Sequence, residues 1–244
     1  MKKVDILAIG VHPDDVELSC SGTLLRHIAQ GKTVGLLDLT RGELGTRGSA
    51  EIRDQEALDA AQLMGASFRI NLGMADGFFQ NNKENVLSII QVVRSCQPTI
   101  VLANAIRDRH PDHGRAAQLI SEACFYSGLQ KVTTYDDKAL PQDRWRPDAV
   151  YHYIQDRNIK PDFVVDITDY INKKQELILA YRSQFYLPEA KEYAEELDSP
   201  ISGKDFMDFL RAKAASYGRD AGFNFAEGFT VERTPGIDDL FLLK

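Results

Sequence analysis

The feature that most constrains the fold is an alternation of short apolar runs with helix-period segments over the first 130 residues. The runs at 4–9 and 99–103 are almost purely apolar, which is typical of strands buried on both faces of a parallel sheet. In the segment 16–30, apolar side chains recur at helical spacing up to a glycine, Gly31. This β-α-β-α pattern predicts an α/β fold with helices on both faces of the sheet.

The pattern loosens after residue 130, so we predict two regions of one domain. Residues 1–130 would form a Rossmann-like, doubly wound, mainly parallel core, and residues 131–244 a C-terminal α+β extension that completes the site. No Pro/Gly/Ser-rich linker separates them, which favours a single domain over residues 1–244. Strands are predicted at 4–9, 33–39, 68–72, 99–103, 149–154 and 163–167, and helices at 16–30, 51–64, 85–93, 114–126, 169–182 and 203–217.

Charge and hydropathy exclude two classes of partner. The chain carries 29 Lys and Arg against 36 Asp and Glu, a net charge of −7, which disfavours binding to nucleic acid. No apolar stretch is long enough for a membrane span. Three widely spaced cysteines, Cys20, Cys96 and Cys124, suit free thiols in a reducing compartment and exclude a structural zinc site on cysteine. We therefore expect a cytoplasmic protein that binds neither nucleic acid nor a membrane.

Two clusters of His and Asp follow predicted strands. Strand 4–9 runs into residues 10–15 (GVHPDD), and strand 99–103 is followed by residues 108–113 (DRHPDH). An isolated His-Pro-Asp is common in loops, because Asp and Pro favour turns for backbone reasons. Ligands of open parallel sheets, however, bind beyond the carboxyl ends of the strands. Two such clusters at two strand ends therefore indicate a ligand site.

The residue types of these clusters suit hydrolytic metal chemistry. A catalytic zinc site needs about three protein ligands and an open position for water. His12, Asp15 and His113 can supply the ligands, because a spacing of three lets His12 and Asp15 converge within one tight turn. Asp14 would then be free to act as the general base. We expect Zn²⁺ as the cofactor, although Fe²⁺ or Co²⁺ could occupy the same ligands.

Four further residues are candidates for catalysis or substrate binding. His110, as the imidazolium, could stabilise the oxyanion formed when water adds to a carbonyl, and Asp112 would orient or charge it. Arg53 and Arg109 lie near the predicted cleft and could hold a substrate carboxylate. Arg53 would sit early in a helix, where a cation is disfavoured unless an anion is near. The alternative for both arginines is pairing with nearby acidic side chains.

The two motifs also carry a resemblance to a known family. His12-Pro13-Asp14-Asp15 with His110-Pro111-Asp112-His113 downstream resembles the signature of the zinc-dependent N-acetylglucosaminyl deacetylases of the GPI, mycothiol and bacillithiol pathways. Segments across nearly the whole chain resemble the bacillithiol branch, namely 40–48, 71–74, 76–77, 151–154, 181–185 and 226–229.

The resemblance implies a substrate, a site and an assembly. The substrate would be N-acetylglucosaminyl-malate, and its N-acetyl group would be removed. Zinc would be held by His12, Asp15 and His113, with Asp14 as general base and His110 as the oxyanion-stabilising residue. The protein would also be a homo-oligomer, specifically a hexamer.

Other functions are weighed against this one. A deacetylase or amidase for another N-acetyl sugar, such as a chito-oligosaccharide or a thiol conjugate, fits the motifs equally well. A non-haem iron oxygenase shares the two-His-one-carboxylate ligand set, but the expected fold argues against it. A dinucleotide-binding oxidoreductase would need a glycine-rich turn, which residues 10–15 lack. A non-enzymatic metal-binding module would not need Asp14 and His110 beside an open coordination position. The sequence leaves the roles of Arg47, His152 and Tyr193 open.

Overall fold

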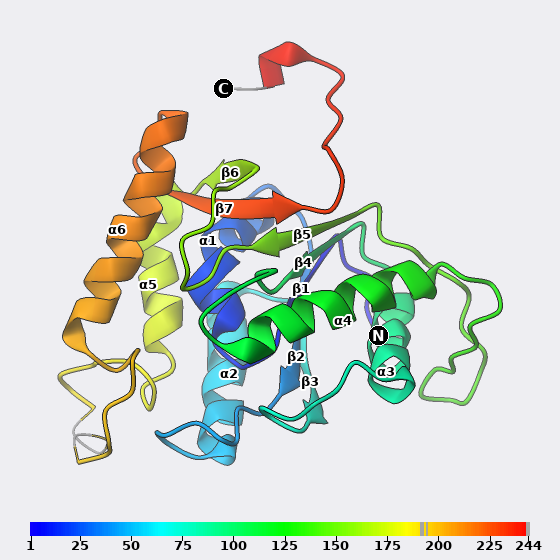
Figure 1. Cartoon of the computed structure of the whole chain (residues 1–244), viewed down its shortest axis with the longest axis horizontal. Helices are drawn as coiled ribbons and strands as arrows, with labels where there is room; N and C mark the ends of the chain where they lie inside the picture. The colour runs from blue at the N-terminus through cyan, green and yellow to red at the C-terminus, as the bar shows by residue number, and fades with distance from the viewer. Residues whose placement is uncertain (191–192, 194, 243–244) are drawn as a thin grey trace.

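The structure, a computed structural model, describes residues 1–190, 193 and 195–242. Within these residues seven strands form one sheet in the order β3-β2-β1-β4-β5-β7-β6 (Figure 1). The strands are β1 (Ile6–Gly10), β2 (Val34–Thr40), β3 (Phe68–Met74), β4 (Ile100–Ala103), β5 (Ala149–Tyr153), β6 (Phe163–Asp166) and β7 (Ala226–Val231). The first five strands pair in parallel, which confirms the predicted α/β class and mainly parallel sheet.

The helices follow the predicted pattern, with ends fixed by local chemistry. Helix α2 begins where the Ser49 side chain accepts the N–H of Ile52, and it ends at Gly65, whose φ of 83° suits glycine. Helix α5 is shorter at both ends than the predicted 169–182, and a 3₁₀ turn, η1 (Thr168–Tyr170), takes the place of its first residues. The helices are α1 (Asp15–Ala29), α2 (Ala50–Met64), α3 (Lys83–Cys96), α4 (Pro111–Ser127), α5 (Ile171–Leu179) and α6 (Lys204–Ala221), and a second 3₁₀ turn is η3 (Leu240–Leu242).

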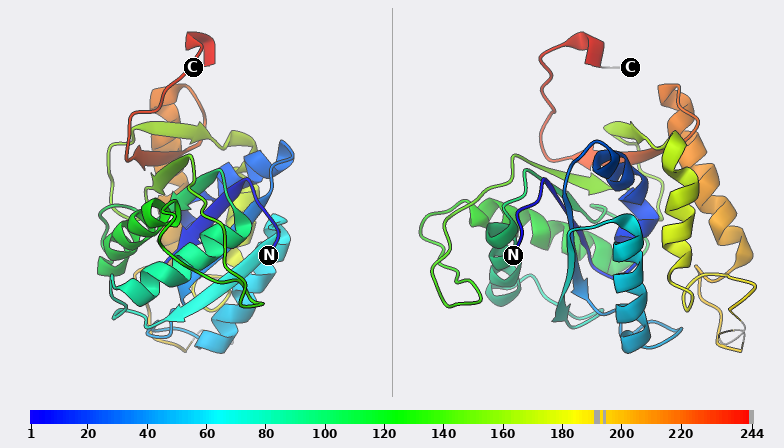
Figure 2. Two further views of the ribbon diagram at one scale, coloured as in Figure 1. Left: turned by 90° about the vertical axis from the view of Figure 1, so that its right-hand side faces the viewer. Right: turned by 180° about the vertical axis from the view of Figure 1, so that it is seen from behind.

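Helices cover both faces of the sheet (Figures 1 and 2). Along β1, Leu7 and Ile9 belong to the core cluster that includes side chains of α3 and α4, whereas Ile6 and Ala8 belong to the cluster that includes side chains of α1, α2 and α5. This alternation follows from the period of two along a strand. Because β1 is buried on both faces, its sequence is a continuous apolar run.

Strand β7 was not predicted. It lies between β5 and β6 and runs antiparallel to both, so residues near the C-terminus join the same sheet. Its sequence hides the strand, because Glu227 and Gly228 interrupt the apolar side chains. Glu227 is buried and accepts hydrogen bonds from the backbone of Gly22 and Thr23 and from Lys174 Nζ. Because the carboxylate of Glu227 is buried with these partners, β7 can lie inside the sheet although its sequence lacks the apolar pattern of a strand.

After β7 the chain leaves the body of the molecule (Figure 1). The side chains of residues 232–241 are exposed, including Leu240 at 78% and Phe241 at 92%. Across the described helices, we find none with an apolar stretch long enough to cross a bilayer.

Candidate metal centre

A cleft opens where β1 and β4 end. The two strands pair in parallel, with Ile6 opposite Ile100, so the loops that follow them lie side by side. The cleft has a volume of about 370 Å³. Its lining includes both His/Asp motifs and also residues of α6, which comes from the C-terminal part of the chain. Its lining includes His12, Asp14, Asp15, Arg53, Arg109, His110, His113, Phe206, Leu210, Lys213 and Tyr217.

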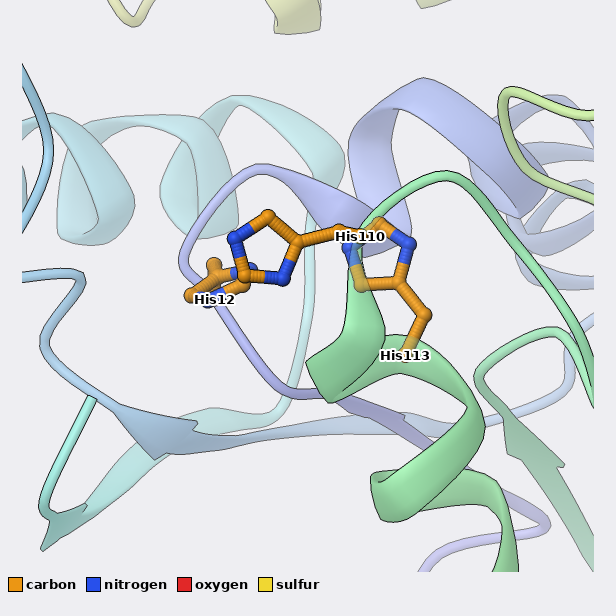
Figure 3. A group of neighbouring side chains, drawn as sticks. All are labelled: His12, His110 and His113. Atoms are coloured by element: carbon orange, nitrogen blue, oxygen red, sulfur yellow. The ribbon is translucent and has the colours of Figure 1, made fainter. Parts of the chain in front are cut away.

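The structure brings the three predicted metal ligands together. His113 Nε2 lies 3.2 Å from Asp15 Oδ1, and His12 Nδ1 lies 3.8 Å from Asp15 Oδ2. The rings of His12, His110 and His113 gather at this point (Figure 3), with ring centroids 4.8 to 5.7 Å apart. These side chains come from the segments that follow β1 and β4, which are far apart in the sequence, and β1–β4 pairing brings them together.

His12 and His113 each have a carboxylate near the ring nitrogen that points away from Asp15. Asp108 Oδ2 lies 2.5 Å from His113 Nδ1, and Asp76 Oδ1 lies 2.9 Å from His12 Nε2. Such carboxylate–histidine pairs fix the ring and make the opposite nitrogen a better metal ligand. In both rings, the opposite nitrogen is the one near Asp15. A donor set of two imidazoles and a carboxylate, oriented this way, fits a divalent metal ion.

His110 offers an alternative third ligand. Nitrogens of His12, His110 and His113 lie within 4.8 Å of one another, as do ligand atoms of a second group, His12 with Asp76 and Asp112. We favour Asp15, because the free nitrogens of His12 and His113 both face it. His110 Nδ1, in contrast, already accepts the backbone N–H of Asp112 at 3.3 Å.

The charges around the site favour a cation. Burial by itself would lower the pKa of His12, but hydrogen bonds to Asp112 and Asp76 raise it to about 10. Burial likewise opposes protonation of His113, but Asp15 and Asp108 raise its pKa to about 9. Burial would raise the pKa of Asp15, but the two histidines lower it. The negative carboxylates therefore outweigh the effect of burial, so the site favours positive charge. A bound metal ion would supply this charge in place of the protons on the two imidazoles.

Asp14 has the geometry of a general base held in place. Its φ is 106°, outside the ordinary range for a residue with a Cβ. Arg53 fixes it there, because Nη2 donates to Asp14 Oδ2 at 2.7 Å and to the Pro13 carbonyl at 2.9 Å. Burial raises the pKa of Asp14 to about 7, although the charge of Arg53 opposes the shift. A carboxylate with a pKa near neutrality can both take and return a proton.

The two predicted arginines have acidic partners. The anion that balances Arg53 near the start of α2 is Asp14, and the Arg53 side chain is buried. Arg109 is more exposed, and its Nε donates to Asp156 Oδ2 at 2.7 Å. Both line the cleft, and a direct contact with substrate stays a prediction for each.

His110 and Asp112 differ in detail from the expectation. Burial, followed by the charges of His12 and His113, lowers the pKa of His110, which favours the neutral ring over the predicted imidazolium. Since Nδ1 accepts the N–H of Asp112, the proton of the neutral ring is on Nε2. The Asp112 carboxylate accepts the N–H of Gly77 at 2.8 Å and pairs with Arg115, and its negative charge opposes the lowering of the His110 pKa.

Four residues of the site had no assigned role in the sequence analysis. Asp76 and Asp108 hold the two histidines, and Asn104 and Gln155 donate to Asp15. Two of them could have been found from their position in the sequence, because Asn104 directly follows β4 and Gln155 comes two residues after β5. Polar side chains at strand ends of a parallel sheet are candidates for its site.

The three residues whose roles the sequence left open make structural contacts. The Arg47 guanidinium donates to the carbonyls of Ser183 and Tyr193, which ties these two residues to the loop before α2. His152 is buried, and its ring nitrogens lie 2.8 Å from the Asn104 carbonyl and 3.2 Å from Glu232.

Comparison with known proteins shows the family. Residues 7–124, which contain both motifs, match the family model described as PIG-L: GlcNAc-PI de-N-acetylase. Diacetylchitobiose deacetylase from Thermococcus kodakarensis is 30% identical over 242 residues, covering 95% of this chain and 84% of that protein. The crystal structure of the conserved protein TT1542 from Thermus thermophilus has a TM-score of 0.83 and 34% identity, covering 98% of both chains. The chain belongs to the PIG-L family.

The predicted closeness to the bacillithiol branch is not confirmed. A protein named "Probable N-acetyl-alpha-D-glucosaminyl L-malate deacetylase 2" from Bacillus anthracis is 25% identical over 197 residues, covering 74% of this chain and 81% of that protein. The Thermococcus kodakarensis deacetylase is more similar over a longer stretch. Family membership is thus shown, and the particular substrate is not.

Proposed function

We propose that the protein is a metal-dependent N-deacetylase that hydrolyses the acetamido group of a small molecule containing N-acetylglucosamine. The observation that carries the proposal is the convergence of His12, Asp15 and His113 beside Asp14 in one cleft. The deacetylases among its relatives support the same reaction.

The side chains divide the reaction between them. A divalent ion held by His12, Asp15 and His113 would make a water molecule more acidic and polarise the acetyl carbonyl. Asp14 takes the proton of the water that attacks the carbonyl carbon and returns it to the departing nitrogen, so that acetate and a free amine result. His110 donates its Nε2–H to the carbonyl oxygen as that oxygen becomes negative. Arg53 keeps the Asp14 carboxylate in place.

Zn²⁺ is the proposed ion, because two imidazoles and a carboxylate form a typical catalytic zinc set. Fe²⁺ and Co²⁺ accept the same ligands. Activity of metal-stripped protein, restored separately with each ion, ranks the three.

Two substrates follow from different observations. The Thermococcus kodakarensis relative favours diacetylchitobiose or a related chito-oligosaccharide. The segments that resemble the bacillithiol branch, together with the Bacillus anthracis relative, favour N-acetylglucosaminyl-malate. Acetate release from each, beside N-acetylglucosamine, with stripped and zinc-restored protein, decides between them. Absence of release from all three by the zinc-loaded protein would contradict the proposed function.

Replacing the base separates hydrolysis from metal binding. Asp14→Asn should lower kcat by about 10²- to 10⁴-fold while the bound zinc per chain stays unchanged, because Asp14 holds a proton and not the ion. Zinc content and acetate release are measured on the same sample. Asp59→Asn, at an exposed position of α2, serves as the control and should change neither. An unchanged kcat in Asp14→Asn contradicts the assignment of Asp14.

We also propose that the protein is a homo-oligomer, specifically a hexamer, in the cytoplasm. The exposed apolar side chains Leu240, Phe241 and Phe78 support burial against another copy. Light scattering after size exclusion tests the assembly, and cell fractionation tests the location.

A further inference from the structure

Two amide side chains lie behind the carboxylate of Asp15. Strands β4 and β5 pair in parallel, with Ala103 opposite His152, so Asn104 and Gln155 leave neighbouring strand ends. Asn104 is fully buried and Gln155 is 8% exposed. Neither has a role in the chemistry described above, although both touch the proposed metal ligand.

The orientation of the Gln155 amide is fixed by a backbone group. The N–H of Ala105 can only donate, and it points at Gln155 Oε1 at 3.1 Å. The oxygen therefore faces Ala105, and the NH₂ group faces the site. Its Nε2 donates to Asp15 Oδ1 at 2.9 Å and lies 3.4 Å from His113 Nε2.

Gln155 in turn orients Asn104. Asn104 Nδ2 donates to Gln155 Oε1 at 3.0 Å and to Asp15 Oδ2 at 2.9 Å. In this orientation Asn104 Oδ1 is buried without a hydrogen-bond partner, which is unfavourable. Rotating the Asn104 amide by half a turn would place its oxygen against Gln155 Oε1 and Asp15. These atoms are also acceptors, so that orientation is less favourable still. The pair therefore holds two N–H donors on Asp15.

The two oxygens of Asp15 are consequently not equivalent. Oδ2 accepts hydrogen bonds from the backbone N–H of His12, at 2.9 Å, and from Asn104 Nδ2. These two bonds occupy both acceptor positions of Oδ2. Oδ1 accepts only Gln155 among these donors, and it lies 3.2 Å from His113 Nε2. One acceptor position of Oδ1 is therefore free on the side where the ligands meet.

We propose that Gln155 and Asn104 are positioning residues that make Asp15 bind the metal ion through Oδ1 alone. The inference rests on the proposed function only in placing a divalent ion at this site. Binding through one oxygen instead of two leaves a coordination position free for water and the acetyl oxygen. The amides thus set the coordination number without touching the ion.

Cobalt(II) titrated into the metal-stripped protein tests the inference without any substrate. Gln155→Met removes the donor to Oδ1 and the support of Asn104, and should weaken cobalt binding about 10- to 100-fold in chelator competition. Asn104→Leu frees an acceptor position of Oδ2, so that Asp15 can bind through both oxygens. The visible absorption of bound cobalt, which weakens as the coordination number rises, should therefore fall in Asn104→Leu.

Gln184→Met is the matched control, because Gln184 is also a buried glutamine of the cleft but donates to Arg47 O and Ser183 Oγ. It should keep the cobalt affinity and spectrum of the unmodified protein. Thermal unfolding shows whether each variant folds, and if Gln155→Met does not, the Asn104→Leu spectrum decides. Unchanged affinity and spectrum in both folded variants overturn the inference and leave the deacetylase standing. No cobalt binding by the unmodified protein overturns both.

Discussion

Lys213 shows how burial changes a single charge on the cleft wall. Its Nζ donates to the carbonyl of Asp156 and lies 6.0 Å from the ring centroid of Tyr217. Burial lowers the pKa of Lys213 to about 8, against the opposing charges of Asp108 and Asp156 and with a small contribution from Lys174. Since the pKa of an unfolded lysine is about 10.4, this amine destabilises the folded state whenever it is protonated.

The sign of the resulting pH dependence is fixed. Between about pH 8 and pH 10 the unfolded state binds more protons than the folded state, so this group makes stability rise with pH in that window. Lys213→Met should therefore be more stable than the unmodified protein at about pH 7, by about 1–2 kcal/mol, and this advantage should shrink towards about pH 10. Urea unfolding at both pH values measures it. Lys204→Met, at an exposed position of α6, is the control, and an advantage for Lys213→Met that does not change with pH contradicts the argument.

Residues of the site were predictable from sequence where they share a short motif. His12, Asp14 and Asp15 stand in one turn at a strand end, so their proximity follows from spacing alone. Asp76 and Gln155 come from other loops, and only strand order places them beside His12 and Asp15. The partner of Arg53 was missed for the same reason, because its anion lies in a different loop.

At the scale of elements, helix α1 packs unusually close to the end of β6. A Cβ built on Gly22 would lie 2.8 Å from the Cβ of Ile167, a distance that real side chains do not reach. The adjacent N–H groups of Gly22 and Thr23 donate to Glu227 of β7. Gly22 thus fixes the distance between α1 and the C-terminal strands. Strand β7 itself could not be predicted from apolar periodicity, because the contacts that hold it against α1 are made by the charged side chain of Glu227.

Gly22→Ala tests this packing by the sign of its effect. In an ordinary helix the change stabilises by up to about 1 kcal/mol. Here we expect a loss of about 1–3 kcal/mol, because the Cβ of Ile167 cannot move away without shifting the backbone. Denaturant unfolding gives the value, and any stabilisation would show that the approach of α1 to Ile167 is looser than described.

At the scale of the whole molecule, the proposed metal ligands join the segments that follow β1 and β4. The strand order that makes them neighbours was foreseen in outline from the alternation of elements, and the placement of the C-terminal part was not. An ion that binds only the folded protein stabilises it by about 2.7 kcal/mol at a concentration of about 100 times Kd.

Zinc added to stripped protein should therefore raise Tm by about 5–10 °C for a chain of this size. A fluorescence-monitored melt over a zinc series measures the shift. His113→Ala removes one ligand and should abolish most of it. A shift that survives in His113→Ala would place the zinc elsewhere.

The pairing of β1 with β4 also orders events during synthesis. At about 5–20 residues per second, the ribosome takes about 5–20 s to make the roughly one hundred residues between His12 and His113. During that time β1 has no partner on the β4 side, and the first motif has no second histidine. Long-range parallel pairing is itself slow to form. The nascent chain must therefore extend past β4 before the two motifs can meet, and the proposed metal site can form only late in synthesis.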